Sequence, residues 1–369
     1  MDMARFIKNE LPKLFPPSPK PVSAALLKLG RRLTESGSLR AADAARAVEI
    51  MMEGECAPYE AGLFLSAFQS SDCTPRALAA MTRAMRARMV PVAVRPGKGP
   101  LGDNCGTGGD NLHLFNISTA AMFILTAAGV RIAKHGNRAS TSRCGSADAL
   151  EALGARIDLG PAEVARCIEE TGIGFMFAPR YHPAMKNVSA VRRALPFRTV
   201  FNLLGPLCNT APVDFQILGV YHPDMLDLAG KTAQLLEIPR ALIVCGGTGR
   251  RGRWMDEVSV SGATRGVLLA KGRLRPVEIT PRKLGIPRAP IDSFRGGTPR
   301  RNAGILMGIL AGKDWGPRRD ICLANAAVGL YAAGTAPDLR EGMAQAREAL
   351  ENGRALRVFR RFIAATLNA

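Results

Sequence analysis

Apolar residues recur with a helical period through the first quarter of the chain. In four segments they return at intervals of three and four positions: 24–33, 41–52, 59–68 and 77–89. That spacing places the apolar side chains of each segment along one face of a helix. Ser38 and Thr74 precede two of the segments, and such residues often cap helix N-termini. The pattern predicts a small all-helical domain over residues 22–95.

The pattern changes after a proline- and glycine-containing stretch at residues 90–100, a linker or crossing strand. Short β-branched runs of the kind found in strands follow: 130–133, 215–220, 241–245, 257–260 and 267–269. Helix-like segments lie between and after them: 147–153, 161–170, 225–236 and 301–310. Strands that alternate with helices are typical of an α/β domain, here expected over residues 96–369.

The first 21 residues differ from both domains because they are rich in proline after Leu11. We expect an N-terminal extension with a short helix over residues 3–11 and then an extended arm. Termini of this composition are seldom packed against a core. The extension is therefore predicted to be dispensable.

Residues 103–148 carry the chemistry. Gly106, Gly108 and Gly109 allow the backbone to approach a ligand with its N–H groups exposed. Ser118 and Thr119 come directly before an apolar, helix-like run, and the N–H groups at a helix start favour anions. The segment fits neither the dinucleotide fingerprint nor the nucleoside-triphosphate P-loop. It nevertheless predicts a phosphate cradle.

A basic loop follows the apolar run, and it supplies cations, amides and hydroxyls with almost no acidic residue. Its polar members are Lys134, His135, Asn137, Arg138, Ser140, Thr141, Ser142 and Arg143. Guanidinium and ammonium groups with hydroxyls suit a polyanionic substrate. The cradle and the loop together predict a site for phosphate groups.

The composition of the chain limits which other classes of protein it could belong to. Of the 369 residues, 50 are basic and 31 acidic, a net charge of +19, which alone suggests nucleic acid or an anionic surface. The basic residues are spread along the chain, however, and no segment interleaves them with aromatic residues that would stack bases. Eight scattered cysteines indicate neither a zinc site nor a disulfide framework. No apolar stretch is long enough for a membrane span, and we expect a cytoplasmic protein.

Three further motifs accompany the cradle: HPAMKNVSAVRRAL (182–195), FNLLGPLCNTA (201–211) and MDEVSVSG (255–262). In this order and approximate spacing, the set resembles the anthranilate phosphoribosyltransferases of tryptophan biosynthesis. The resemblance covers most of residues 101–330. It implies a small helical domain, to which a segment near 180–198 adds, and a larger α/β domain whose central mixed, mostly parallel sheet is flanked by helices, with the active site in the cleft between the domains.

The resemblance implies a reaction in which 5-phosphoribosyl 1-diphosphate and anthranilate give N-(5-phosphoribosyl)anthranilate and diphosphate. It also implies the residues that bind the phosphoribosyl donor: Gly106, Gly109, Asp110, Asn116, Ile117, Ser118, Thr119, Lys134, His135, Gly136, Asn137, Arg138, Ser142 and Ser146. Anthranilate is expected at Gly106, Asn137 and Arg192, with the neighbouring Arg193 turned elsewhere. Mg²⁺ is expected at Ser118, Asp256 and Glu257.

Two features depart from the family pattern. Leu114 stands where the family usually has Thr or Ser, and it removes one hydroxyl from the expected donor contacts. The segment that leads into the acidic pair, residues 246–257, is longer and more basic than usual. Arg250, Arg251 and Arg253 either reach substrate phosphates or face water, and we expect water. No Ser-His-Asp or Cys-His arrangement is evident, and no covalent or strong acid–base residue is expected.

Two alternatives stay open from the sequence. A pyrimidine nucleoside phosphorylase-like enzyme would share the architecture but should lack the Asp256–Glu257 pair. A non-catalytic nucleic-acid-binding paralogue would explain the charge of +19, although the intact substrate motifs oppose it. The resemblance also implies a homodimer formed through the helical domain.

Overall fold

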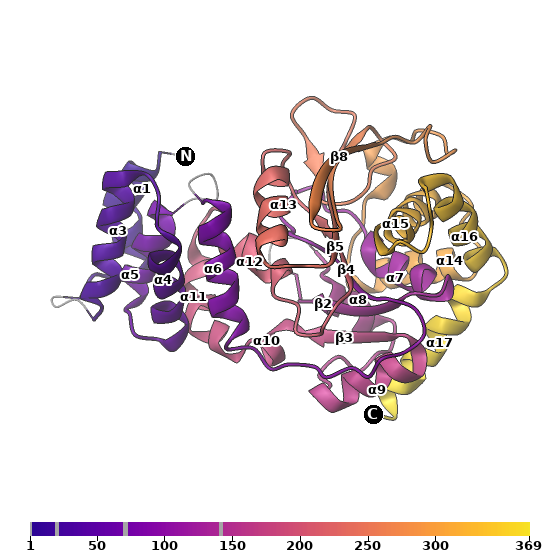
Figure 1. The fold of residues 1–369 in the computed structure, drawn as a ribbon, viewed down its shortest axis with the longest axis horizontal. Helices are drawn as coiled ribbons and strands as arrows, with labels where there is room; N and C mark the ends of the chain where they lie inside the picture. The colour runs from indigo at the N-terminus through magenta and orange to yellow at the C-terminus, as the bar shows by residue number, and fades with distance from the viewer. Residues whose placement is uncertain (1, 19–21, 69–72, 140–142) are drawn as a thin grey trace. The chain divides into compact units, whose positions relative to one another are not determined.

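The structure is a computed structural model that describes residues 2–18, 22–68, 73–139 and 143–369. The chain divides into two compact units. The smaller unit contains residues 1–90 together with two later segments, Tyr181–Cys208 and Lys231–Leu236. The larger unit contains Pro91–Arg180, Asn209–Gly230 and Glu237–Ala369. Figure 1 shows the fold coloured from the N-terminus to the C-terminus.

The smaller unit is helical, as its apolar period predicts. Its helices are α1 (Met3–Asn9), α2 (Leu11–Leu14), α3 (Ala24–Ser36), α4 (Ala41–Glu53), α5 (Pro58–Ala67), α6 (Pro75–Arg86), α11 (Lys186–Ala194) and α12 (Phe201–Leu207), with a 3-10 turn at Pro183–Met185. The predicted cap is present at Thr74, whose side chain accepts from the N–H of Ala77 at the start of α6. Helix α4 ends at Gly54, which has a positive φ of 75°.

The N-terminal extension differs from the expected loose arm. Helices α1 and α2 both pack on α5, and Leu11 is fully buried. The Phe6 ring meets that of Phe197 edge to face, with centroids 5.3 Å apart. The expectation of an unpacked terminus was wrong because each of the two short helices buries an apolar side chain, Phe6 on α1 and Leu11 on α2.

The larger unit is built on one mixed, mostly parallel sheet. In the described part of the chain its strands are β1 (Leu101–Gly106), β2 (Arg131–Gly136), β3 (Ile173–Phe177), β4 (Phe215–Gly219), β5 (Arg240–Gly247), β6 (Trp254–Met255), β7 (Thr264–Ala270) and β8 (Arg273–Ile279). Their order is β3-β2-β1-β4-β5-β7-β8, with β6 paired to β5. The strands β3, β2, β1, β4 and β5 are parallel to one another. The strands β6, β7 and β8 pair antiparallel.

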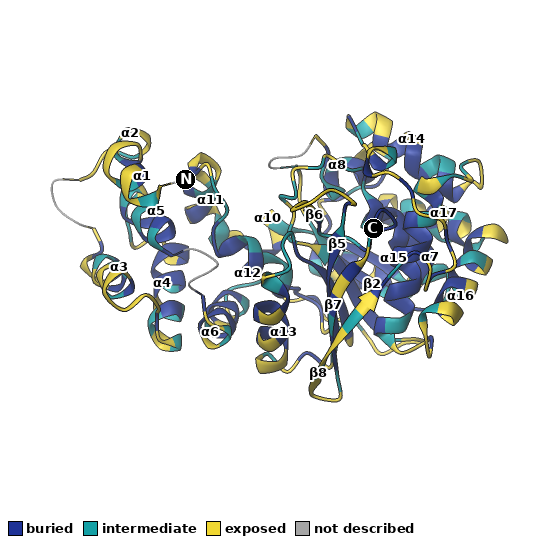
Figure 2. Cartoon of the chain, turned by 90° about the horizontal axis from the view of Figure 1, so that it is seen from above, coloured by how far each residue is buried: buried dark blue, intermediate teal, exposed yellow. Residues whose placement is uncertain are grey.

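Helices flank this sheet, which confirms the predicted fold class. They are α7 (Ile117–Ala127), α8 (Ser146–Ala152), α9 (Pro161–Thr171), α10 (Ala178–Tyr181), α14 (Pro299–Leu310), α15 (Pro317–Ala333), α16 (Leu339–Glu351) and α17 (Arg354–Leu367), with α13 (Met225–Leu235) beyond β4 and a 3-10 turn at Ile291–Phe294. Helix α7 packs against β1 to β3 on one side and against α15 to α17 on the other, and both α7 and α15 are largely buried (Figure 2). Within this core the Phe123 ring contacts those of Phe359 and Phe362.

The strand expected at residues 257–260 is not formed. Its backbone groups bond to side chains instead of a neighbouring strand: Val258 N donates to Asn325 Oδ1 at 3.0 Å, and Ser259 N donates to Thr264 Oγ1 at 2.8 Å. Val258 and Val260 are fully buried, which explains the strand-like pattern. The alternation of apolar residues therefore reflects burial of their side chains and not a ladder of backbone hydrogen bonds.

Candidate active site

Four of the parallel strands end in glycine at the same edge of the sheet. Strands β1, β2, β4 and β5 end at Gly106, Gly136, Gly219 and Gly247. Gly106 and Gly219 pair in register. A Cβ on Gly106 would lie 2.4 Å from Asp256 Oδ2, and one on Gly219 would lie 1.7 Å from the backbone oxygen of Asp256. These glycines therefore make room for Asp256 at the edge where α/β folds commonly bind ligands.

The glycine-rich turn leaves β1 and closes over this acidic residue. Gly108 and Gly109 have φ of 68° and 80°, a region that favours glycine. The N–H of Gly108 donates to Asp256 Oδ2 at 2.6 Å. Asp110 continues the turn by accepting from the N–H of Leu112 at 2.9 Å. The turn and Asp256 thus form one hydrogen-bonded structure.

Glu257 lies at the start of α7. Its Oε1 accepts from the backbone N–H of Ser118 at 3.1 Å, in the first turn, where the helix dipole favours a negative charge. Two other expected donor-binding residues of this turn, Ile117 and Thr119, are fully buried. The Thr119 hydroxyl has no hydrogen-bond partner among the described residues.

Lys134 is buried beneath the same helix terminus. Its Nζ donates to the backbone oxygen of Asn104 at 2.5 Å and to Ser118 Oγ at 3.3 Å. Burial lowers the pKa of Lys134, and the attraction of Asp103, which is fully buried on β1, opposes that effect. Lys134 therefore connects Asn104 on β1 to the Ser118 hydroxyl at the start of α7.

The partly buried acidic pair lies in an electrostatically unfavourable place. Burial raises the pKa of Glu257 to about 8, and repulsion by Asp256 adds to the rise. Burial, followed by repulsion from Asp110, also raises the pKa of Asp256 above its ordinary value. Carboxylates packed so closely favour either a proton or a cation between them. Among the described residues no group of three or more His, Cys, Asp or Glu side chains could hold a metal by themselves.

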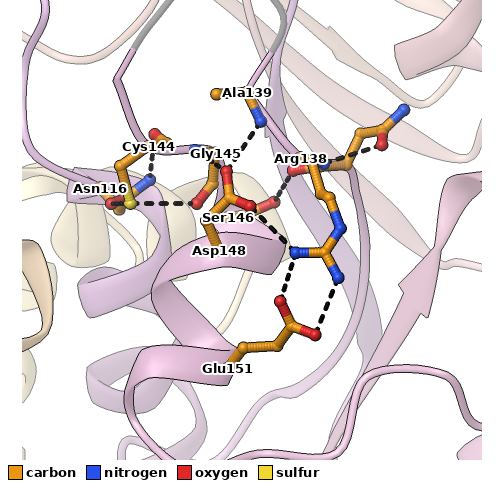
Figure 3. Close-up of polar contacts among 9 residues, drawn as sticks. Asn116, Arg138, Ala139, Cys144, Gly145, Ser146, Asp148 and Glu151 are labelled. Atoms are coloured by element: carbon orange, nitrogen blue, oxygen red, sulfur yellow. Dashed lines mark hydrogen bonds and ion pairs between the residues drawn. The ribbon is translucent and has the colours of Figure 1, made fainter. Parts of the chain in front are cut away.

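Asp148 bonds to described residues at both ends of the basic loop after β2 (Figure 3). Its Oδ2 accepts from the N–H groups of Ala139 at 2.9 Å and Gly145 at 2.8 Å. Burial opposes ionisation, but these bonds and the Arg138 guanidinium outweigh it and hold the pKa of Asp148 below its ordinary value. Arg138 pairs with both Asp148 and Glu151 and stacks on the Phe177 ring, 5.6 Å from its centroid. Its charge is thus already neutralised by α8.

The other expected residues of this loop lie around the end of β2. A Cβ on Gly136 would come within 2.2 Å of Ser146 Oγ and 2.7 Å of the Phe175 ring, so a larger residue would force these side chains to shift. The exposed Asn137 accepts from the N–H of Arg138 at 2.7 Å through its Oδ1. The N–H of His135 donates to Asp103 at 3.4 Å. Ser142, like Ser140 and Thr141, lies outside the described residues.

Arg192 belongs to the smaller unit, on α11. Its guanidinium lies 5.2 Å from the centroid of the Phe201 ring, and burial lowers its pKa to about 10. No carboxylate within the described residues forms an ion pair with it. Arg193, next in sequence, is exposed. A partly buried cation without an acidic partner is suited to an anionic ligand.

The two departures from the family pattern have structural explanations. Leu114 packs on the core and forms an antiparallel bridge with Arg295. Arg250 does not simply face water, because it forms an ion pair with Asp292, which also pairs with Arg295. Arg251 and Arg253 are exposed, as expected.

Sequence reasoning missed several residues that support the site, namely Asp103, Asn104, Asp148 and Asn302. Asn104 Nδ2 donates to the backbone oxygen of Ser118 at 2.7 Å, and Asn302 Nδ2 donates to Asn116 Oδ1 at 2.8 Å. Asp148 stands three residues after Gly145, a spacing that signals a helix-capping carboxylate. The other three carried no local signal, because their partners come from distant parts of the sequence.

Comparison with known proteins agrees with this geometry. Residues 98–356 match the a/b domain of a glycosyl transferase family, and residues 27–89 match the helical bundle domain of the same family. An anthranilate phosphoribosyltransferase from Chloroflexus aurantiacus is 43% identical over 327 residues, which are 88% of this chain and 94% of the relative. One from Thermomicrobium roseum is 44% identical over 317 residues, 85% of this chain and 89% of the relative.

Solved structures are similar over nearly the whole chain. Anthranilate phosphoribosyltransferase from Thermus thermophilus superposes with a TM-score of 0.83 at 41% identity, covering 93% of this chain and 99% of that one. The Saccharomyces cerevisiae enzyme in complex with PRPP and Mg has a TM-score of 0.85 at 28% identity, with 94% and 99% coverage. The chain therefore belongs to the anthranilate phosphoribosyltransferase family of glycosyl transferases.

Proposed function

We propose that this protein transfers the phosphoribosyl group of 5-phosphoribosyl 1-diphosphate to the amine of anthranilate, giving N-(5-phosphoribosyl)anthranilate and diphosphate. The observation that carries the proposal is the arrangement at the carboxyl edge of the sheet. There Asp256 and Glu257 accept hydrogen bonds from the glycine-rich turn and from the first turn of α7. This arrangement combines backbone donors for phosphate with carboxylates for a cation.

The phosphoribosyl donor is proposed to lie between the glycine-rich turn, the start of α7 and the basic loop. Gly106, Gly109, Asp110, Asn116 and Ser118 would form one side of this cradle, and His135 to Arg138 with Ser146 the other. A yeast relative was solved in complex with PRPP and Mg, which supports the choice of this donor. Arg138 would have to share its guanidinium between the phosphate and the α8 carboxylates, because its backbone N–H already donates to Asn137 Oδ1.

The residues present fit Mg²⁺. Asp256 and Glu257 bring two partly buried carboxylates with raised pKa values, and Ser118 Oγ lies in the same hydrogen-bonded network. Mg²⁺ usually takes one or two carboxylates and completes its shell with water and substrate phosphates, which agrees with the small protein ligand set. When bound, it would supply positive charge to the departing diphosphate.

The acceptor is proposed to be recognised by Arg192, Gly106 and Asn137. The partly buried Arg192 lacks an acidic partner among the described residues, and its planar guanidinium suits the carboxylate of anthranilate. A yeast relative was solved with 4-fluoroanthranilate, an analogue that keeps this carboxylate.

The chemistry needs orientation and charge stabilisation more than a proton acceptor. An aryl amine is neutral near pH 7 and already nucleophilic, so the main barrier is formation of an oxocarbenium-like C1 centre. This chain's residues would bind the two substrates with the amine facing C1. No covalent intermediate is required.

Neither alternative considered from the sequence gains support from the relatives. A pyrimidine nucleoside phosphorylase-like enzyme was expected to lack the acidic pair, which is present and partly buried here. No helix in the described part of the chain is long and apolar enough to span a membrane.

We further propose that the protein is a homodimer and acts in the cytoplasm. Light scattering after gel filtration would test the oligomeric state.

The function is tested by mixing the purified protein with 5-phosphoribosyl 1-diphosphate, Mg²⁺ and anthranilate. Turnover is followed as loss of anthranilate fluorescence, with diphosphate measured in parallel. Formation of diphosphate in step with anthranilate loss is expected. A protein that consumes neither substrate, or that instead cleaves pyrimidine nucleosides with phosphate, would contradict the proposal.

A further inference from the structure

Two side-chain amides are joined in series beside the start of α7. The N–H of Gly297 donates to Asn302 Oδ1 at 2.8 Å, and Asn302 Nδ2 donates to Asn116 Oδ1 at 2.8 Å. Asn116 Nδ2 then donates to the backbone oxygen of Cys144 at 3.2 Å. All four residues belong to the larger unit. Asn302, on α14, is only 1% exposed.

The two ends of this series determine the orientation of both amides. A backbone N–H can only donate and a backbone carbonyl can only accept. Gly297 therefore requires the oxygen of Asn302, and Cys144 requires the nitrogen of Asn116. The thiol of Cys144 also donates to Asn116 Oδ1, at 3.4 Å, which reinforces the same orientation.

The orientation decides what Asn116 offers to a ligand. Its oxygen already accepts from Asn302 and Cys144, and one of its two amide N–H groups is used by the Cys144 carbonyl. The second N–H has no hydrogen-bond partner among the described residues, and Asn116 is partly exposed. A reversed amide would present an oxygen, which repels phosphate, where the N–H now stands.

We propose that Asn302 is a positioning residue for 5-phosphoribosyl 1-diphosphate, because it holds the Asn116 amide with an N–H available to a phosphate oxygen. The inference rests on the proposed function, in which Asn116 forms part of the donor cradle. Asn302 does not touch the substrate and acts through Asn116.

The adjoining backbone is held independently of Asn302, which makes the proposal testable. Phe115 N donates to the oxygen of Phe294 at 2.9 Å, and Gly296 N donates to the oxygen of His113 at 2.9 Å. These bonds tie the loop before α7 to the segment before α14. A change at Asn302 should therefore alter the Asn116 amide without releasing the loop.

The experiment is a double-mutant cycle read in the KM for 5-phosphoribosyl 1-diphosphate. Asn302→Leu removes both side-chain bonds, and Asn302→Asp keeps an acceptor for Gly297 but loses the donor to Asn116. Each should raise this KM by about tenfold or more while kcat stays within about threefold, the pattern of lost binding. In an Asn116→Ala background the same changes should add less than about twofold, because the two residues act as one unit.

Leu306→Ala is the matched control, since Leu306 lies one turn further along α14 in the core and its loss destabilises without reaching Asn116. It should lower the melting temperature and leave the KM for the donor within about twofold. Equal increases in KM with and without Asn116, or an increase in the control as large as that of Asn302→Leu, would overturn the proposal.

Calorimetric titration with 5-phosphoribosyl 1-diphosphate and Mg²⁺, without acceptor, separates this inference from the proposed activity. If the wild type binds the donor but does not consume anthranilate, the activity fails and the cycle is completed on the dissociation constants, with the same expected non-additivity. If the wild type does not bind the donor, the positioning role is refuted together with the cradle.

Discussion

The carboxylate of Asp256 accepts a hydrogen bond of 2.6 Å from the backbone N–H of Gly108, 148 positions earlier in the chain. This bond joins the glycine-rich turn to the acidic pair, which the sequence showed only as two separate motifs. It also places the Asp256 carboxylate against a backbone N–H group of the turn. A cation and a phosphate that arrived together would satisfy both partners, which suits a metal–diphosphate complex better than a free anion.

The acidic pair should matter most as the bond at C1 breaks. Changing Asp256→Asn together with Glu257→Gln keeps shape and removes both negative charges. We expect kcat to fall by at least about 10²-fold, the usual order for loss of a preorganised electrostatic element, with a raised Mg²⁺ requirement and little change in the KM for anthranilate. Steady-state kinetics across a Mg²⁺ titration measures this. Near-normal turnover at limiting Mg²⁺ would show that the metal is held elsewhere.

Arg192 and Arg193 form a natural matched pair. Arg192→Ala should raise the KM for anthranilate by about tenfold or more, because a charge-assisted contact of about 1.5–3 kcal/mol is lost. Arg193→Ala, at an exposed position, should change it by less than about twofold. Initial rates at saturating donor distinguish the two variants. Similar effects at both positions would remove Arg192 from the acceptor site.

Gly219 should not tolerate a methyl group. In Gly219→Ala the new Cβ would lie 1.7 Å from the oxygen of Asp256, so the backbone that carries the acidic pair must shift. Turnover should drop by at least about tenfold, since small displacements of positioning groups are costly. Gly304→Ala on α14, where nothing lies within 4 Å of the added carbon, is the control and should keep full activity.

The N-terminal helices should contribute to stability. Leu11→Ala removes a fully buried side chain that packs over Gly62 on α5, and we expect a loss of about 2–4 kcal/mol in the free energy of unfolding. Leu14→Ala, at a position 43% exposed, should change it by less than about 0.5 kcal/mol. Urea denaturation measures both. Equal free energies of unfolding for the two variants would mean that the N-terminal helices are not packed against the core.

His182 should make stability depend on pH in the mildly acidic range. Burial lowers the pKa of His182 to about 4, whereas an unfolded histidine titrates near 6.5. Above pH 6.5 His182 is neutral in both the folded and the unfolded state, so it does not change the free energy of unfolding. As pH falls from about 6.5 towards 4 the unfolded state gains a proton first, and stability is lost.

Between pH 6.5 and 5 this amounts to about 2 kcal/mol. Urea denaturation at pH 7 and pH 5 should show a smaller loss for His182→Gln than for the wild type. His222→Gln, at a partly buried position whose side chain is 45% exposed, should show the wild-type loss. A His182→Gln variant that loses as much stability as the wild type would contradict the assignment.

The sequence by itself determined the fold class, the helical unit and the family. Helices such as α3 to α6 follow from an apolar period and local caps, which depend on residues three or four positions apart. The cradle motif was visible because its glycines, hydroxyls and helix start are contiguous in the chain. Which residues bind substrate and metal remains a prediction from these motifs.

The tertiary structure alone decided the connections between these motifs. Asn302 meets Asn116 across 186 positions, and Glu257 meets Ser118 across 139, so neither pairing leaves a local pattern. The false strand at 257–260 has the same cause, because burial of Val258 and Val260 imitates a strand whose backbone is in fact satisfied by Asn325. Burial and local spacing can be inferred from neighbouring residues, but the partner of a polar group is chosen by the packed core.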